Sequence, residues 1–303
     1  MKLNIKSDWL VFFRFSIAIY AILNLFAFWK DIPRMLYDGG YLKPELQDAL
    51  ADVYSPTIYD IFVYLNKNNI IVNYDVLVNT IAIIYVVALI SLLLGLFTRV
   101  SAAIALLLQI VIYKSMHLYL YGADFFLTMA IFYCVIFPKS KFSLDYVIFK
   151  FKQNPVSIKW SLLLLQIHVC IIYFFSGLDK GVGINWWNGE AIWKAVNSHD
   201  YNGLISINSL NIPEFVFIIA GTGTVAVEFL YPLFINLKAT RKLWLSLTIL
   251  MHLSIAVFMG LHFFAMIMII LNMAAFYFPY LKEEEEEEEE EANSKSYLVI
   301  SGK

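Results

Sequence analysis

Three groups of ionisable side chains stand out in a very apolar chain. The first is Lys114, His117, Tyr121 and Asp124, spaced i, i+3, i+7 and i+10. If this stretch is helical, the four lie on one stripe, so an amine, an imidazole, a phenol and a carboxylate line one wall. The alternative is an ordinary interfacial turn between two membrane spans, from which polar side chains reach toward water.

The second group repeats every seven residues: Gln166, Tyr173 and Lys180. Seven residues drift only about 20° on an ideal helix, so these three share a face. A desolvated lysine has a lowered pKa and can act as a general base near neutral pH. The alternative is that Lys180 snorkels, or complements a helix C-terminus. Trp186 and Glu190 follow closely, and a tryptophan here fits an interfacial belt.

The third group is Glu228 and His252, both within apolar segments. A carboxylate in mid-span needs a proton or a partner. Arg14 in the first span is a candidate partner, and a structural ion pair is at least as good an explanation as a catalytic role. His252 lacks the spacing of metal ligands, so we expect no metal and a packed imidazole or pocket group.

The composition shows where these residues must lie. Of 303 residues, 60% are hydrophobic and only 15% are charged, and mean hydropathy is +0.70. A soluble globule cannot bury so much apolar surface. An ordinary cytosolic enzyme, a nucleic-acid binder and a disordered chain are therefore excluded. We expect an integral membrane domain over residues 1–282 and an acidic disordered tail over 283–303, which begins with Glu283 to Glu291.

About eight apolar segments approach the roughly 20 residues that a transmembrane helix needs. The sequence thus predicts an all-α, polytopic membrane helical bundle. Lysine and arginine in the loops place both termini in the cytoplasm and the first two groups toward the opposite face. The loop 30–75 should form a small cap with short helices. The expected spans are 10–29, 77–97, 100–113, 125–137, 160–178, 213–235, 243–259 and 262–281.

Several short segments together resemble one known family. In order they are Phe13-Arg14-Phe15, Leu94-Gly95-Leu96-Phe97-Thr98-Arg99, His117-Leu118-Tyr119-Leu120-Tyr121-Gly122-Ala123-Asp124, Tyr173-Phe174-Phe175-Ser176-Gly177-Leu178-Asp179-Lys180, Trp186-x-x-Gly189-x-Ala191, Val227-Glu228-Phe229 and His252. Their order and spacing resemble the horizontally transferred transmembrane (HTTM) family, the bacterial relatives of the vitamin K-dependent gamma-carboxylase membrane domain. The resemblance covers about residues 8 to 281.

The resemblance implies roles for two residues. Lys180 matches the lysine understood to deprotonate reduced vitamin K in the carboxylase, and His117 matches a histidine beside the quinone. It therefore implies a bacterial inner-membrane protein, a reduced vitamin K-like quinone as the candidate cofactor and a carboxylase-like (lyase) reaction. Other small relatives are factors that mature a sporulation-delaying peptide toxin.

Our leading hypothesis is a membrane protein that binds a quinone- or lipid-like ligand in an outward-facing polar cavity. It would modify that ligand, or a peptide through it, with Lys180 as base and His117 as orienter. The second hypothesis is a non-enzymatic accessory factor for maturation or export of a secreted peptide, and the third is a transporter.

The expected partners are a membrane lipid or quinone and a secreted peptide, not nucleic acid. Expected ligand-binding residues are Asp124, Tyr121, Tyr173, Trp186, Glu190 and His252; expected structural or pocket groups are Glu228 and Arg14.

Overall fold

The computed structural model describes residues 8–51, 56–198, 201, 203–205 and 212–281, and in these ranges all regular secondary structure is helical. Six helices here are long and apolar enough to cross a membrane: Trp9–Leu36, Tyr74–Leu94, Thr98–Ser115, Pro155–Val182, Lys238–Met259 and His262–Leu281. The chain is therefore a multi-pass, all-α membrane protein, as predicted. The tail 283–303 lies outside the described residues.

The other two expected spans, the fourth and the sixth, are not among these six helices. The fourth is a 15-residue apolar helix, α7 (Gly122–Ile136). The sixth divides at Leu230 into α12 (Glu214–Phe229) and α13 (Tyr231–Phe234). Pro232 explains this break, because proline has no N–H to continue a helical ladder and clashes with the preceding turn.

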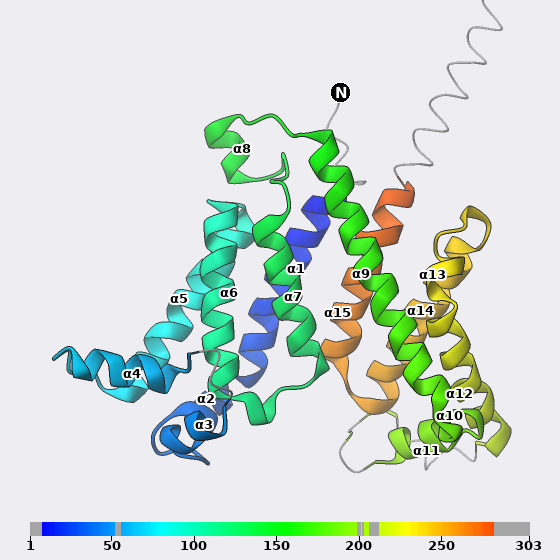
Figure 1. Ribbon diagram of the computed structural model, residues 1–303, viewed down its shortest axis with the longest axis horizontal. Coiled ribbons are helices and arrows are strands. Elements are labelled where there is room, and N and C mark those ends of the chain that lie inside the picture. The colour runs from blue at the N-terminus through cyan, green and yellow to red at the C-terminus, as the bar shows by residue number, and fades with distance from the viewer. Residues whose placement is uncertain (1–7, 52–55, 199–200, 202, 206–211, 282–303) are drawn as a thin grey trace, which may run out of the picture. The chain divides into compact units, whose positions relative to one another are not determined.

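The chain forms two compact units (Figure 1), each described here by itself. Residues 13–158 make the N-terminal unit, and residues 1–12 with 159–303 make the C-terminal unit. The long helices of the N-terminal unit are α1 (Trp9–Phe28), α5 (Tyr74–Leu94), α6 (Thr98–Ser115) and α7. Its short helices are α2 (Ile32–Leu36), α3 (Pro44–Leu50), α4 (Ile58–Lys67) and α8 (Leu144–Phe149).

Small residues let the N-terminal helices pack closely. Helix α6 contacts both α5 and α7, and Ala102, Ala105, Ala123 and Ala130 on α6 and α7 are completely buried. Lipid tails are as apolar as leucine, so close van der Waals packing across small residues holds membrane helices together. The short helices α3 and α4 lie between the first two spans, where the sequence predicted short helices.

The junction between α5 and α6 is held by two buried charged residues from elsewhere in the chain. Gly95 ends α5 with a φ of +68°. Arg14 donates to the carbonyl oxygens of Leu92 (2.7 Å), Leu93 and Phe142 (2.7 Å). The carbonyls of Leu92 and Leu93 lie at the C-terminus of α5, where a cation is stabilised by the helix dipole.

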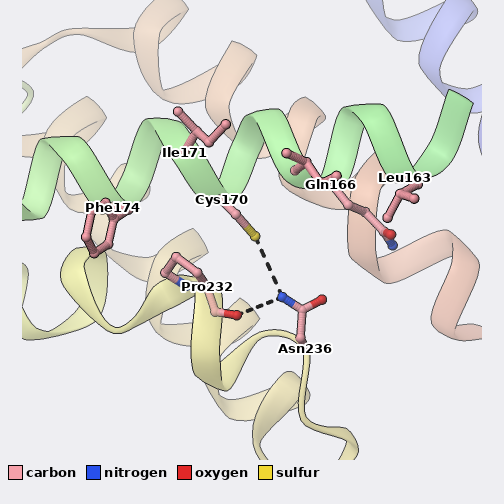
Figure 2. A pocket seen from close by; sticks show the side chains of 8 residues that line it. Leu163, Gln166, Cys170, Ile171, Phe174, Pro232 and Asn236 are labelled. Atoms are coloured by element: carbon pink, nitrogen blue, oxygen red, sulfur yellow. Dashed lines mark hydrogen bonds between the residues drawn. The ribbon is translucent and has the colours of Figure 1, made fainter. Parts of the chain in front are cut away.

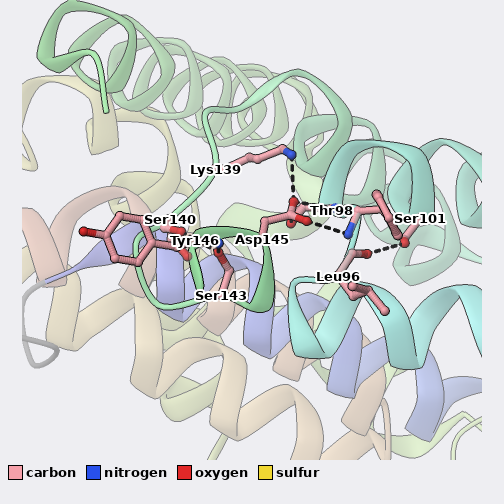
Figure 3. Close-up of polar contacts among 9 residues, drawn as sticks. Leu96, Thr98, Ser101, Lys139, Ser140, Ser143, Asp145 and Tyr146 are labelled. Atoms are coloured by element: carbon pink, nitrogen blue, oxygen red, sulfur yellow. Dashed lines mark hydrogen bonds and ion pairs between the residues drawn. The ribbon is translucent and has the colours of Figure 1, made fainter. Parts of the chain in front are cut away.

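Asp145 on α8 holds the start of α6, as Figure 3 shows. Its carboxylate accepts hydrogen bonds from the backbone N–H groups of Phe97 (2.7 Å) and Thr98 (2.9 Å) and pairs with Lys139 at 2.8 Å. Burial would raise the pKa of the Asp145 carboxyl, but Lys139 and the Thr98 and Phe97 donors outweigh it and hold the pKa below its usual value.

Replacing Asp145 by alanine should lower the free energy of unfolding by about 1–3 kcal/mol, because buried donors at the start of α6 lose their acceptor. Since the folded-state pKa is depressed, the stabilisation is complete above the unfolded-state pKa and is lost as pH falls through the folded value. Thermal unfolding of the purified protein from neutral to acid pH measures both effects. Asp31→Ala, which removes an exposed carboxylate, is the control; an equal loss in both variants contradicts the capping role.

The C-terminal unit is built from α9 (Pro155–Val182), α12, α14 (Lys238–Met259) and α15 (His262–Asn272). Two short helices, α10 (Ile184–Trp187) and α11 (Glu190–Asn197), follow α9 and pack on α12. Helices α14 and α15 contact each other, and α15 continues into a π-helical turn, Met273–Tyr277.

Candidate functional site

The C-terminal unit contains an ion pair between two membrane helices. Lys180 Nζ on α9 lies 2.7 Å from Glu228 Oε2 on α12 and 2.5 Å from the hydroxyl of Ser176. The side chain of Lys180 is 21% exposed and that of Glu228 only 8%. The indole of Trp186 lies 5.3 Å from the same ammonium, within range of a cation–π interaction.

Gly177 allows the two helices to approach closely enough for this pair. A Cβ placed on Gly177 would lie 2.7 Å from Cα of Phe229 and 2.8 Å from the carbonyl carbon of Glu228. One turn further along α9, a Cβ on Gly181 would meet only a Val225 methyl group at 3.5 Å. The α9–α12 contact is therefore tightest at Gly177.

The pair lies where two helices end. Glu228 is the second-to-last residue of α12, which ends at Phe229. Lys180 lies two residues before the end of α9 at Val182. The ion pair therefore joins the last turns of α9 and α12.

Glycines also hold Trp186 against α12. A Cβ on Gly221 would collide with the backbone carbonyl of Trp186. Gly189 has a φ of +79°, and a Cβ there would lie 2.6 Å from the backbone of Phe217 and Ile218. The Trp186-x-x-Gly189 segment therefore positions the indole beside Lys180.

Glu190, by contrast, is solvent-facing. It pairs with Lys194 at 2.7 Å across one turn of α11, and the hydrogen bond from Lys194 lowers its pKa. Exposed pairs of this kind contribute little to stability. Among the described contacts, the Glu190 side chain pairs with Lys194, whereas Lys180 pairs with Glu228.

A second polar network lies about two turns before Lys180 on α9, at Tyr173. The amide of Asn272 donates to the Tyr173 hydroxyl (2.7 Å), which lies 2.7 Å from His252 Nε2, and Tyr231 donates to Asn272 Oδ1 (2.6 Å). Because the Tyr173 oxygen already accepts from Asn272, its proton points to Nε2, which leaves the His252 proton on Nδ1. That Nδ1 is buried and has no partner among the described residues. Such a donor usually has a ligand or a water as its partner.

The residues of the first group do not form one helical stripe, so that prediction is wrong. Helix α6 ends at Ser115, a 3₁₀ turn covers His117–Tyr119, and α7 begins at Gly122. The cause is Asp124, which accepts from the N–H of Tyr121 (3.0 Å) and starts a new helix. The alternative, a turn between two spans, is what forms.

His117 and Asp124 have separate hydrogen-bond partners within the N-terminal unit. His117 Nδ1 lies 3.3 Å from the Lys114 carbonyl. A carbonyl can only accept, so Nδ1 is the protonated nitrogen and Nε2 carries the lone pair in neutral imidazole. Asp124 is 6% exposed and is hydrogen-bonded to the side chains of Tyr113 and Asn24. Both residues belong to the N-terminal unit, whereas Lys180 belongs to the C-terminal unit.

Arg14 and Glu228 are not partners of each other in the structure. Arg14 binds the carbonyls at the end of α5, and Glu228 binds Lys180. The arginine therefore binds the C-terminus of α5.

The C-terminal unit also has a hollow of about 350 Å³ between α9 and α13. Figure 2 shows Cys170 and Phe174 on one wall and Pro232 and Asn236 on the other. The Asn236 amide donates to the Pro232 carbonyl (2.7 Å) and contacts the Cys170 sulfur (3.7 Å). The hollow is mainly apolar and begins at Phe174, which stacks on Phe229 next to Glu228.

Sequence reasoning missed several residues of these networks. They are Ser176, Asn272 and Tyr231 around α9, and Tyr85, Gln109 and Thr128, which are hydrogen-bonded to one another in the N-terminal unit. Their signal is the amide or hydroxyl within an apolar span: Gln109 and Asn272 are each completely buried. Such residues usually face other helices, not lipid.

Comparison with known families matches the HTTM domain to residues 51–280. The chain belongs to the HTTM family. Comparisons with curated proteins and with solved structures found no match. The matched range contains Lys180, Glu228, His117 and His252, so both polar clusters belong to the HTTM domain.

The donor set around Lys180 fits a ligand that bears an oxygen. An ammonium has three N–H donors, and Ser176 and Glu228 account for two of them among the described contacts. A third donor beside a tryptophan face can hold a phenolic or carbonyl oxygen of a flat ring. The orphaned Nδ1 of His252 is a further donor in the same unit.

Proposed function

We propose that this HTTM protein is a membrane enzyme that binds a reduced quinone- or lipid-like ligand at Lys180 and removes a proton from it. The observation that supports this most is the 2.7 Å Lys180–Glu228 pair between two apolar helices. Ionisable residues at membrane depth are costly and usually mark a functional site.

The pair is suited to moving a proton. Lys180 Nζ passes a proton to Glu228 Oε2, and the resulting neutral amine can accept a proton from a ligand hydroxyl. A bound reduced quinone would supply an ionisable hydroxyl and two-electron redox chemistry.

Other residues have supporting roles in this proposal. Trp186 stacks against the ligand ring. Tyr173 orients His252, and His252 donates its Nδ1–H to a polar atom of the ligand. In the N-terminal unit, we assign His117 a ligand-orienting role through its Nε2 lone pair, and Tyr121 and Asp124 a ligand-binding role. We place the protein in a bacterial inner membrane with both termini in the cytoplasm.

Native mass spectrometry of the detergent-purified protein tests the proposal. The wild type should retain a quinone or lipid, and Lys180→Ala and His117→Ala should lose it while remaining folded. Lys194→Ala removes an exposed lysine and should retain the ligand. Equal retention by Lys180→Ala and wild type would contradict the base role.

A second candidate function is that of an accessory factor for a secreted peptide. The observation that favours it is that Lys180 and Glu228 already neutralise each other, as in a purely structural pair. In that case maturation or export of the peptide would survive the loss of both Lys180 and His117.

A further inference from the structure

A concave site unrelated to Lys180 lies in the cap of the N-terminal unit. It encloses about 390 Å³ between the turn after α2, the start of α3, helix α4 and the start of α5. Its lining includes three carboxylates and three aromatic rings: Asp38, Glu45, Asp75, Tyr59, Phe62 and Tyr74. Asp38 and Glu45 precede the region matched by the HTTM domain, so this site is partly outside the family's common core.

The charge of the hollow is one-sided. No lysine or arginine lines it, and no ion pair involving Asp38, Glu45 or Asp75 occurs within the part of the chain that the structure describes. The Asp75 carboxylate accepts a hydrogen bond from the backbone N–H of Asp38, at 3.0 Å. Three uncompensated carboxylates in one concavity attract cations and repel anions.

The aromatic residues form a compact cluster beside these charges. The Phe62 and Tyr74 rings are edge-to-face at 5.4 Å, and Tyr59 lies 6.4 Å from Tyr74 and 6.2 Å from Phe62. Ring faces bind organic cations by cation–π attraction. Desolvation, followed by the charges of Glu45 and Asp48, raises the pKa of Tyr59, which agrees with a negative potential here.

We propose that this hollow binds the ammonium or guanidinium side chains of a basic peptide segment. Carboxylates supply the charge, and Tyr59, Phe62 and Tyr74 supply ring contacts to the aliphatic stem and the cation. This inference does not rest on the chemistry at Lys180.

Two other classes of cation fit less well. A divalent metal needs several clustered ligands, and among the described residues no group of three or more histidine, cysteine, aspartate or glutamate side chains could hold one. A zwitterionic lipid headgroup carries a phosphate next to its ammonium, and three carboxylates without a basic residue would repel that phosphate.

The test measures fluorescence anisotropy of dye-labelled tetralysine with the full-length protein in phosphatidylcholine nanodiscs. The acidic run would itself bind tetralysine, so every protein carries the background Glu283–Glu291→Gln. We expect saturable binding that weakens with added salt and at least tenfold weaker binding in Asp38→Asn/Glu45→Gln. Asp31→Asn, which removes an exposed carboxylate from the same unit, should bind like the background protein.

Phe62→Leu keeps the three carboxylates and should weaken tetralysine binding several-fold. This variant tests the site even if Asp38→Asn/Glu45→Gln does not fold. Tetralysine acetylated on its side chains should not bind. Unchanged affinity in both Phe62→Leu and the carboxylate variant would overturn the proposal. So would equal binding of the acetylated peptide, or displacement of tetralysine by added phosphatidylethanolamine, which would assign the hollow to a lipid.

Discussion

Replacing Lys180 by methionine should lower the free energy of unfolding by about 3–5 kcal/mol, the cost of removing one partner of a buried pair. The side chain of Glu228 is only 8% exposed and has no second cation among the described contacts. Its charge would be left without compensation between two apolar helices. Unfolding of the purified protein in mixed detergent micelles measures the loss.

The matched variant removes both charges. Lys180→Met/Glu228→Leu should recover most of the lost stability, because a hydrophobic replacement of a buried pair is often neutral or stabilising. Lys194→Met breaks only an exposed pair and should change stability by less than about 1 kcal/mol. If Lys180→Met unfolds like wild type, or the double variant is the least stable of the set, the pair is not the buried contact described here.

Gly177→Ala should separate α9 from α12 and disrupt the same pair. A methyl group there would lie 2.7 Å from Cα of Phe229, which is backbone and cannot rotate away. Overpacking of this kind costs about 1–3 kcal/mol, and the ion pair adds its own loss. Gly181→Ala on the same helix face is the control, since its new methyl would meet Val225 at an ordinary 3.5 Å.

The readouts are unfolding and ligand retention of the two alanine variants. Gly177→Ala should lose both stability and ligand, and Gly181→Ala should keep both. Equal behaviour of the two variants would show that close helix approach at Gly177 does not position Lys180.

The helices could be predicted because span length and hydropathy depend on local sequence. The predicted spans 10–29, 160–178 and 262–281 correspond to observed helices. Where a predicted helix was wrong, one side chain in the apolar segment ended or started a helix. Pro232 divides the sixth span, and Asp124 starts α7 and so ends the stripe that Lys114 and His117 would have shared with it.

The partners of the buried charges could not be predicted, because sequence does not say which helices are neighbours. The sequence offered Arg14 as the partner of Glu228, but in the structure Arg14 binds carbonyls at the end of α5 and Lys180 pairs with Glu228. Gly177 could have indicated the partner helix. A small residue three positions before Lys180 marks the face of α9 where another helix approaches.

The measurement that tests the central claim most directly compares ligand binding at equal stability. Native mass spectrometry of wild type and Lys180→Met/Glu228→Leu, purified identically and titrated with the same reduced naphthoquinone, separates the chemistry of the pair from its effect on folding. The account predicts a bound quinone in wild type and none in the folded double variant. Equal binding by both proteins would contradict it and assign the Lys180–Glu228 pair a purely structural role.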